Sequence, residues 1–204
     1  MSKYPVIIFE GIEASGKSTN LNLVSKYLKD KGKKYIKLRE PGGSKVSELI
    51  RKLLLNKKLK LNNKTDLMLF YAARCENFEK VIKKNYKKKI ILIDRFSDST
   101  VAYQHYGMNI NLKVIKIINK FIIGSFKPDV TFLSTVNVKN LKSRLNKRLK
   151  LNRYDKFKIN FYKKVQKGYY KISKVNKNNI IIDSNKMTIK EIKKYIIYKL
   201  EKII

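Results

Sequence analysis

The sequence of 204 residues is poor in several residue types, and each shortage narrows what the chain can be. Its single cysteine, Cys75, excludes an internal disulfide bond and any metal centre built on several cysteines. No run of 18 apolar residues occurs, so the sequence predicts no transmembrane helix. Residues 1–5 lead at once into an apolar stretch and leave no room for a signal peptide. We therefore expect a cytoplasmic protein that does not contact a membrane.

Acidic residues are also scarce, and the formal net charge is +34 with a pI near 10.1. Such a charge is typical of nucleic-acid-binding proteins. Here the lysines are spread over the whole chain, which is also rich in Asn, Ile, Tyr and Phe, residues with A/T-rich codons like lysine. We favour genome composition as the cause and do not expect nucleic acid as a partner. The charge would still attract polyanionic ligands such as nucleotides.

Arginine is the scarce basic residue, with seven among 49 lysines and arginines. If lysine serves wherever a plain positive charge is enough, arginine should remain where planar, two-pronged contacts to phosphate or base are needed. The seven are Arg39, Arg51, Arg74, Arg95, Arg144, Arg148 and Arg153. Proline and glycine are rare too, and four of the eight glycines lie in two loops, at 11–16 and 42–43.

The first of these loops contains a phosphate-binding motif. Residues 11–18 read G-I-E-A-S-G-K-S, a full G-x-x-x-x-G-K-[ST] match between an apolar run and a helical pattern. Lys17 would bring charge to the β- and γ-phosphates, and the Ser18 hydroxyl suits Mg²⁺. A chance match in a lysine-rich chain is the alternative. The predicted contacts to ATP in this loop are Gly11, Ile12, Glu13, Ala14, Ser15, Gly16, Lys17, Ser18 and Thr19.

Apolar runs alternate with amphipathic patterns along the whole chain. Strands are expected at 4–9, 35–38, 90–93, 129–134 and 179–182. Helices are expected at about 17–30, 44–56, 65–85, 111–123, 137–148, 158–175 and 188–202. This alternation predicts a three-layer α/β fold, a five-stranded parallel sheet flanked by helices, in one domain over residues 1–204. The Lys/Asn-rich segments 56–64 and 174–179 are expected to be loops.

The third expected strand ends in Asp94 followed by Arg95. An apolar strand ending in Asp is typical of the second half of a P-loop site, where the carboxylate reaches Mg²⁺. A motor ATPase usually continues with Glu, which polarises water. Arginine at that position favours the binding of a second phosphorylated substrate, and hence a kinase. A surface ion pair at the strand end is the alternative.

Two further segments could contribute to a second substrate site. The run R-E-P-G-G at 39–43 is either a plain turn or a rigid loop that aims Arg39 and Glu40 into the site. Phe70 and Arg74 share one helical face at a spacing of four and could stack on a base and bond its edge. A core phenylalanine beside a solvent-facing arginine fits the local pattern equally well.

A third cluster, Arg144, Arg148 and Arg153, lies at the end of one expected helix and in the loop after it. The spacing of four places Arg144 and Arg148 on one face. Two or three arginines on a connecting segment suggest a mobile lid, over about residues 142–157, that closes over ATP. A solvated basic face is the alternative, against which the scarcity of arginine argues.

Taken together, these motifs resemble the bacterial thymidylate kinase family, which phosphorylates dTMP to dTDP with ATP. The resemblance runs nearly end to end and is specific in combination. It rests on F-E-G-I-E-A-S-G-K-S-T (9–19), R-E-P-G-G (39–43), L-F-Y-A-A-R (69–74), D-R-F-S-D-S-T-V-A-Y-Q (94–104), F-K-P-D-V-T (126–131) and N-R-Y-D (152–155). It implies a P-loop kinase fold with a lid, ATP and Mg²⁺ as cofactors, and a homodimer.

The resemblance also implies contacts to dTMP. Glu13 would contact the 3′-hydroxyl, Arg39 and Arg95 the phosphate, Phe70 the face of thymine and Arg74 its O4 edge. The other implied substrate contacts are Glu40, Arg51, Ser99, Thr100, Tyr103, which packs below the deoxyribose, and Gln104.

The resemblance further implies a lid-arginine enzyme, because Ala14 leaves the P-loop without an arginine. Arg153 would then supply the transition-state charge, with Arg148 as a second candidate, and Arg144 would pack on adenine. The implied catalytic residues are Lys17, Arg95, Arg148 and Arg153, and the implied Mg²⁺ ligands are Ser18 and Asp94. The family usually has Asp before the lid arginine, where this chain has Asn152, so a carboxylate that would orient Arg153 is missing there, although Asp155 is close by.

Two alternatives remain at the level of the sequence. One is another nucleoside monophosphate or deoxynucleoside kinase, because base preference is inferred from side chains alone. The other is a nucleic-acid-binding P-loop ATPase, which the charge of +34 supports.

Overall fold

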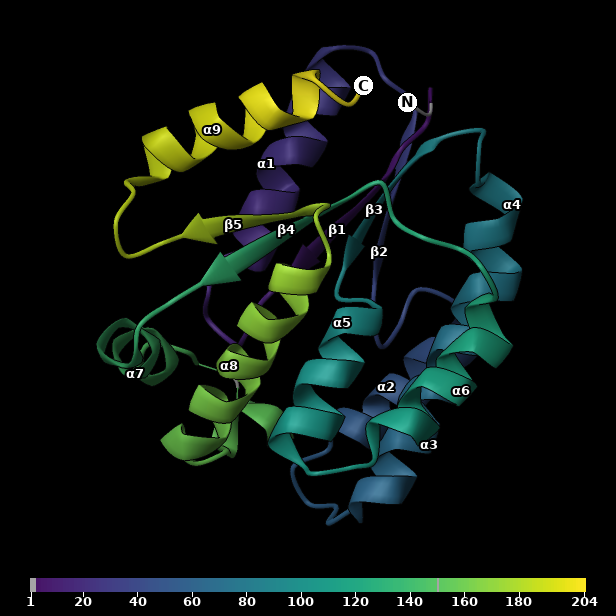
Figure 1. Ribbon diagram of the computed structural model, residues 1–204, viewed down its shortest axis with the longest axis vertical. Coiled ribbons are helices and arrows are strands. Elements are labelled where there is room, and N and C mark those ends of the chain that lie inside the picture. Colours follow the sequence, from purple (N-terminus) through teal and green to yellow (C-terminus); the bar gives the residue numbers. More distant parts are fainter. Residues whose placement is uncertain (1–2, 150) are drawn as a thin grey trace.

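The structure is a computed structural model that describes residues 3–149 and 151–204 (Figure 1). Position 150 of the expected lid lies outside the described residues. The described chain forms a five-stranded sheet in the order β2-β3-β1-β4-β5. Its strands are β1 Val6–Glu10, β2 Tyr35–Arg39, β3 Ile90–Asp94, β4 Val130–Thr135 and β5 Asn179–Asp183. Every neighbouring pair is parallel, which confirms the expected sheet.

Helices cover both faces of this sheet. The helical elements are α1 Lys17–Asp30, α2 Lys45–Leu55, α3 Asn63–Asn77, the π-helix η1 Phe78–Ile82, α4 Lys83–Asn85, α5 Ser97–Thr100, the π-helix η2 Val101–Gly107, α6 Leu112–Ile123, α7 Val138–Asn146, the 3₁₀-helix η3 Arg153–Lys156, α8 Ile159–Val175 and α9 Ile189–Glu201. In Figure 1, α1 and α9 lie together on one side of the sheet, and α2, α3, α5, α6 and α8 lie on the other. The expected three-layer α/β architecture is confirmed.

The sheet is apolar because both of its faces are covered. All five residues of β1 are buried, and its side chains alternate between two core clusters. Ile7 and Phe9 pack in the cluster that includes Val24 of α1 and Ile196 of α9. Val6 and Ile8 point to the opposite cluster. The strand order reverses around β1, so its carboxyl end opens on the crevice where sheets of this kind bind ligands.

Two helical segments were not predicted: the short 3₁₀-helix η3 within the expected lid, and a longer segment after Arg95. No element was expected between Arg95 and the helix predicted from residue 111, yet α5 and η2 fill residues 97–107. This segment is rich in β-branched and polar residues, which do not favour a helix locally. It is held by tight packing on α8, where a Cβ at Gly168 would lie 2.4 Å from the Tyr106 ring. Tertiary contact, rather than local propensity, therefore forms this helix.

Other boundaries differ by smaller amounts. The helix expected at 65–85 begins at Asn63, where the Asn62 side chain accepts a hydrogen bond from Thr65 N over 2.8 Å. It continues through η1 into α4. The expected loop at 174–179 is shorter, because α8 extends to Val175 and β5 begins at Asn179.

Candidate active site

The loop between β1 and α1 has the backbone geometry of a phosphate-binding loop. Gly11 and Gly16 have φ values of 137° and 101°, a region that favours glycine, and Ala14 has a φ of 53°. A Cβ at Gly11 would lie 2.2 Å from Ser134 O, so no larger residue fits beside β4. Lys17 begins α1, whose N-terminal N–H groups face the loop. The arrangement suits an anion at the helix N-terminus.

Lys17 is buried within this loop and is 7% exposed. Its Nζ donates a hydrogen bond to Ile12 O over 2.8 Å. Burial, and next the charge of Arg95, lower the pKa of the Lys17 ammonium from its usual 10.5 to about 8. The positive charge therefore lies at the loop in a poorly solvated place, where its attraction to a bound anion is stronger than it would be in water.

Ser18 and Asp94 meet at the edge of the same loop. β3 lies beside β1, with Asp94 in register with Phe9, and Ser18 Oγ donates to Asp94 Oδ2 over 2.8 Å. Within residues 3–149 and 151–204, no group of three or more His, Cys, Asp and Glu side chains is placed to hold a metal. A hydroxyl and one carboxylate fit Mg²⁺, which typically takes one or two carboxylates, water and substrate phosphates.

A cavity of about 200 Å³ opens beside the P-loop lysine. It brings together every predicted dTMP contact, from segments spread between positions 13 and 104. These are Glu13, Arg39, Glu40, Arg51, Phe70, Arg74, Arg95, Ser99, Thr100, Tyr103 and Gln104. Several other lining residues were not predicted from the sequence, namely Pro41, Leu55, Phe96 and Tyr154.

Arg95 lies at the phosphate end of this cavity and is fixed from several sides. Its backbone has a φ of 72°, unusual for a residue other than glycine. Its Nη2 pairs with Glu13 Oε1 at 2.9 Å, and its Nη1 donates to Gly11 O at 2.9 Å. Tyr103 lies under the guanidinium, 5.0 Å from Cζ to the ring centroid, and donates to Glu13 Oε2 over 2.5 Å. Glu13 therefore balances the charge of Arg95 in this structure.

Beneath Arg95 lies a buried carboxyl that the sequence analysis did not single out. Glu10 accepts hydrogen bonds from Phe96 N at 2.8 Å, Ser99 N at 3.1 Å and Tyr169 Oη at 2.9 Å. Burial, and next the charge of Asp98, raise the pKa of Glu10 from 4.5 to about 7. A glutamate that ends an otherwise apolar strand was the available signal.

The other end of the cavity contains Phe70 and Arg74 on α3. Arg74 is 2% exposed, which excludes the alternative of a solvent-facing arginine. Its Nε donates to Glu40 Oε2 over 2.7 Å, and its guanidinium lies 5.2 Å from the Phe96 ring centroid. Burial raises the pKa of the Glu40 carboxyl, and Arg74 opposes that rise. Phe70 is only partly buried and meets the Tyr154 ring edge-on, at 5.8 Å between centroids.

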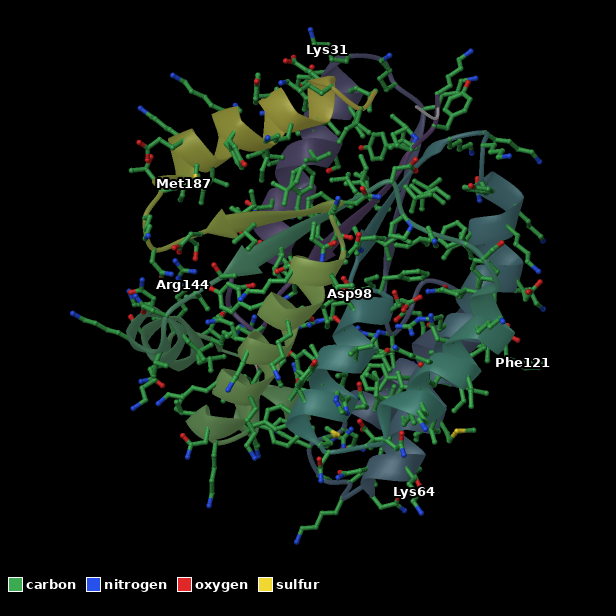
Figure 2. All side chains as sticks on the ribbon, in the orientation of Figure 1. Lys31, Lys64, Asp98, Phe121, Arg144 and Met187 are labelled. Carbon is green, nitrogen blue, oxygen red and sulfur yellow. The ribbon has the colours of Figure 1, made fainter. Side chains whose placement is uncertain are left out.

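A second cavity lies on the other side of the P-loop. It is lined by residues 14–19 of the loop, by Arg144 and Arg148, and by Ser184, Met187 and Thr188 of the β5–α9 connection. Arg144 Nη1 bridges the two sides, donating to Ala14 O at 3.0 Å and Ser184 Oγ at 3.2 Å. Figure 2 shows Arg144 between α7 and the end of β5, with Met187 at the start of α9. The β5–α9 connection was missed, because its sequence carries no motif. Of the predicted ATP contacts, Gly11 and Ile12 line neither cavity.

The structure places the two candidate lid arginines differently from the prediction. Arg148 lines both cavities and forms an ion pair with Asp155. Arg153 lines neither: its Nε donates to Leu54 O over 3.0 Å, and its Nη2 pairs with the buried Asp66. In this structure Arg153 therefore does not reach either cavity, and its role at the transferring phosphate stays a prediction; Arg148 is the lid arginine that borders both cavities.

Asn152 has a role that the sequence analysis did not foresee. Its Oδ1 accepts from Tyr154 N over 2.7 Å, and its own N–H donates to Asp155 Oδ2 over 2.9 Å, which forms a capping box at η3. Asn serves as an N-cap as well as Asp does. The expected lack of a carboxylate for Arg153 is also wrong, because Asp66 of α3 provides it.

No helix of the described residues is long and apolar enough to cross a membrane.

Comparison with known proteins agrees with this geometry. A family model described as thymidylate kinase matches residues 9–196. The chain is 43% identical over 181 residues to a thymidylate kinase of Thermosipho africanus, covering 88% of this chain and 90% of that one. It is 37% identical over 197 residues to one from a Sulfurihydrogenibium species, covering 96% of each. The crystal structure of a thymidylate kinase from Ehrlichia chaffeensis is similar, with a TM-score of 0.77, 33% identity and coverage of 97% and 98%.

Proposed function

The chain belongs to the thymidylate kinase family, and on that premise we propose that it transfers the γ-phosphate of ATP to the 5′-phosphate of dTMP, giving dTDP and ADP. One observation carries the proposal: all of the predicted dTMP contacts line a single cavity, and that cavity opens onto the P-loop lysine. Residues from five separate segments would not converge in this way by chance.

We propose that dTMP lies with its phosphate at Arg95 and its base at Phe70. Arg95 is held beside Lys17 and offers a planar fork that matches a phosphate. Arg39 lines the same end; its side chain is more than half exposed and pairs with Glu48 at 2.9 Å, an exposed ion pair that it would exchange for the phosphate of the ligand. Phe70 offers an aromatic face, and Arg74 offers guanidinium donors for O4 of thymine. Tyr103, buried between these ends, would crowd a 2′-hydroxyl.

ATP would lie across the P-loop on the side of the second cavity. The loop N–H groups and the start of α1 suit its phosphates. Arg144 and Met187 line the far end, where adenine would stack between an arginine plane and an apolar side chain. Arg148 lines both cavities, so it lies where the two substrates would meet.

The transfer itself would be an in-line displacement. A 5′-phosphate oxygen of dTMP attacks the γ-phosphorus, a P–O bond forms, and the bond to the β–γ bridging oxygen breaks to release ADP. The phosphate monoester is already a dianion near pH 7, so no strong base is needed, and Glu13 positions Arg95 rather than abstracting a proton. Lys17, Arg95 and Arg148 neutralise charge that develops on the phosphoryl group.

Ser18 and Asp94 would hold Mg²⁺, since their oxygens lie 2.8 Å apart at the mouth of the P-loop. The ion, when bound, would neutralise charge on the β- and γ-phosphate oxygens. The hydrogen bond between Ser18 and Asp94 keeps both oxygens at this edge of the sheet, where they are hard donors of the kind that Mg²⁺ prefers.

We also propose a homodimer formed through α2, α3 and α6. These helices lie beside one another (Figure 1). Each of them carries exposed apolar side chains. Phe121 and Ile117 of α6 are 86% and 69% exposed, and Figure 2 shows Phe121 at the outer edge of the molecule. The other members of this apolar surface are Leu49, Leu53, Met68 and Val114. Such a group of exposed apolar residues is typical of a protein interface.

A single domain and a cytoplasmic location complete the proposal. One sheet takes its strands from positions 6 to 183, which supports a single folding unit. The use of ATP and the presence of one free cysteine suit the cytoplasm.

The test is a phosphotransfer assay with the purified chain, ATP and Mg²⁺, over dTMP, dUMP, dCMP, dGMP and thymidine. We expect dTMP to be the best acceptor, with dTDP and ADP formed in equal amounts. Preference for another acceptor would indicate a different nucleoside or nucleotide kinase. ATP hydrolysis that needs no acceptor and rises with added nucleic acid would contradict the proposal and support the ATPase alternative.

A further inference from the structure

Asp66 joins the lid to the base end of the substrate cavity. It lies in the first turns of α3, is 1% exposed and belongs to none of the motifs in the sequence. Arg153 and Tyr154 reach it from η3, the tyrosine hydroxyl donating over 2.6 Å. Gln104 reaches it from η2, donating from Nε2 over 3.1 Å. One buried carboxylate therefore receives donors from two segments that both border the cavity.

This contact fixes which way the Gln104 amide is turned. A carboxylate that already accepts hydrogen bonds from a guanidinium offers only acceptor atoms to its other neighbours. The amide nitrogen of Gln104 must therefore face Asp66, and the amide oxygen lies on the opposite side of Cδ. Gln104 lines the substrate cavity, while Asp66 does not. A flip of the amide would set two acceptors against each other in a buried place, which is costly.

We propose that Asp66 is a specificity-determining residue: by orienting Gln104, it presents an amide oxygen that accepts a hydrogen bond from N3–H of thymine. The inference rests on the proposed function, since it assumes that a pyrimidine base occupies this end of the cavity. Thymine carries an N–H at position 3, whereas cytosine carries a lone pair there. Cytosine would thus meet the Gln104 oxygen acceptor to acceptor.

The arrangement acts together with Arg74. Its guanidinium donors suit the O4 acceptor of thymine, and the Gln104 oxygen suits the neighbouring N3 donor. The two contacts form a donor and acceptor pair that matches the edge of thymine or uracil and that, among the pyrimidines, cytosine does not match. A site built around such a pair rejects an analogue with the reversed pattern far more strongly than one that differs by a methyl group.

The test substitutes Asp66→Asn and compares dTMP with 5-methyl-dCMP, which shares the methyl group and differs only at N3 and position 4. An asparagine can donate or accept, so Gln104 is free to flip and offer its NH₂ to N3 of the cytosine. We expect the ratio of kcat/KM for dTMP to that for 5-methyl-dCMP to fall at least about tenfold, a change equivalent to one hydrogen bond. Arg74 still discriminates, so the ratio stays above one.

Two matched variants distinguish a change in the orientation of the Gln104 amide from a general loss of structure or activity. Asp66→Glu retains the carboxylate and should keep the ratio within about threefold of wild type. Asp129→Asn makes the same chemical change at a carboxylate that accepts from Val6 N at the opposite end of the sheet, and it should leave the ratio unchanged. Weaker lid docking would lower turnover of both substrates equally and leave the ratio unaffected.

Asp66→Asn leaves Arg153 without its carboxylate, so folding is checked by thermal melting. Should that variant fail to fold, the double change Asp66→Asn with Arg153→Met removes the unpaired cation and is assayed in the same way. A folded variant with the wild-type ratio would overturn the inference, as would an Asp66→Glu variant that loses as much selectivity as Asp66→Asn. Absence of dTMP phosphorylation by the wild type would instead overturn the proposed function, and this inference with it.

Discussion

Lys17 Nζ donates a hydrogen bond to the backbone oxygen of Ile12, five residues earlier in the same loop, over 2.8 Å. The loop therefore holds its own lysine at the point where phosphate would bind. The side chain is buried and its pKa is lowered to about 8, chiefly by loss of solvent. A phosphate that enters the loop would take the place of Ile12 O as the hydrogen-bond acceptor of Lys17 Nζ. The lysine therefore needs little rearrangement of its side chain to act on phosphate.

Replacement of Lys17 by Ala should therefore nearly abolish phosphoryl transfer and leave the fold intact. The variant removes the charge from the transferring phosphate, and turnover should fall below about a tenth of wild type. Steady-state kinetics measure the loss, and circular dichroism checks the fold. Lys57→Ala, in the exposed segment between α2 and α3, is the matched control and should be silent. A folded Lys17→Ala enzyme with higher turnover would show that the P-loop assignment is wrong.

The two lid arginines should respond differently to replacement by lysine. Arg148→Lys keeps the charge but loses the planar fork, and we expect kcat to fall by at least about 10²-fold with little change in KM for dTMP. Arg153→Lys should lower kcat less and reduce the melting temperature, because it weakens a buried pair with Asp66 and the bond to Leu54 O. The reverse order of effects on kcat would restore Arg153 as the catalyst.

Discrimination among bases should be uneven. Because dUMP lacks only a methyl group, we expect its kcat/KM to be about 10–200-fold below that of dTMP. For dCMP, a 4-amino donor would face the buried Arg74, which is fixed by Glu40 and cannot turn away. We therefore expect dCMP to be rejected more strongly than dUMP. Competition assays with mixed acceptors give the ratios directly, and a dCMP rate close to that of dTMP would rule out the role of Arg74.

Glu10 should make the folded protein less stable as the pH rises through neutrality. Its pKa is raised from 4.5 to about 7, so the folded state binds this proton more tightly than the unfolded state does. The resulting stability is complete below about pH 4.5 and is lost as the pH rises through about 7, with a span on the order of 3 kcal/mol.

The Glu10→Gln variant should not lose this folding stability as the pH rises. Thermal melting between pH 5 and 8 should show a smaller decline for Glu10→Gln than for wild type, because the amide does not titrate. Glu79→Gln makes the same change in an exposed ion pair with Lys83 and should follow the wild-type curve. Parallel curves for wild type and Glu10→Gln would mean that the carboxyl stays ionised in the folded state.

The apolar surface of α2, α3 and α6 should mediate dimer formation. We expect the wild type to sediment at twice the chain mass of 24.0 kDa. Phe121→Glu places a charge where α6 exposes its largest apolar side chain and should shift the mass toward that of one chain. Ile189→Glu, at a 75% exposed position of α9, should leave the dimer intact. A monomeric wild type would contradict the proposed interface.

Much of the site follows from local sequence. The P-loop is a continuous motif whose glycines are required by the backbone path, so its residues can be named without a fold. The central strands β1, β3 and β4 are buried on both faces because helices cover both, and such apolar runs are easily recognised. Motifs at the ends of those strands then predict the cavity, since parallel strands bring their carboxyl ends to one edge. Arg39 and Arg95, which lie at the ends of β2 and β3, were predicted in this way.

The three-dimensional arrangement decided what sequence spacing does not encode. Arg148 and Arg153 are five residues apart and chemically identical, and only the path of the lid shows that one borders both cavities while the other pairs with the buried Asp66. Helix η2 forms because glycine lets α8 approach, a contact between segments sixty residues apart. Asp66 and Glu10 acquire their roles from donors on distant segments. Composition, periodicity and local motifs thus determined the class of fold and the phosphate loop, whereas burial and hydrogen bonding between remote segments determined which charged side chains face the substrates.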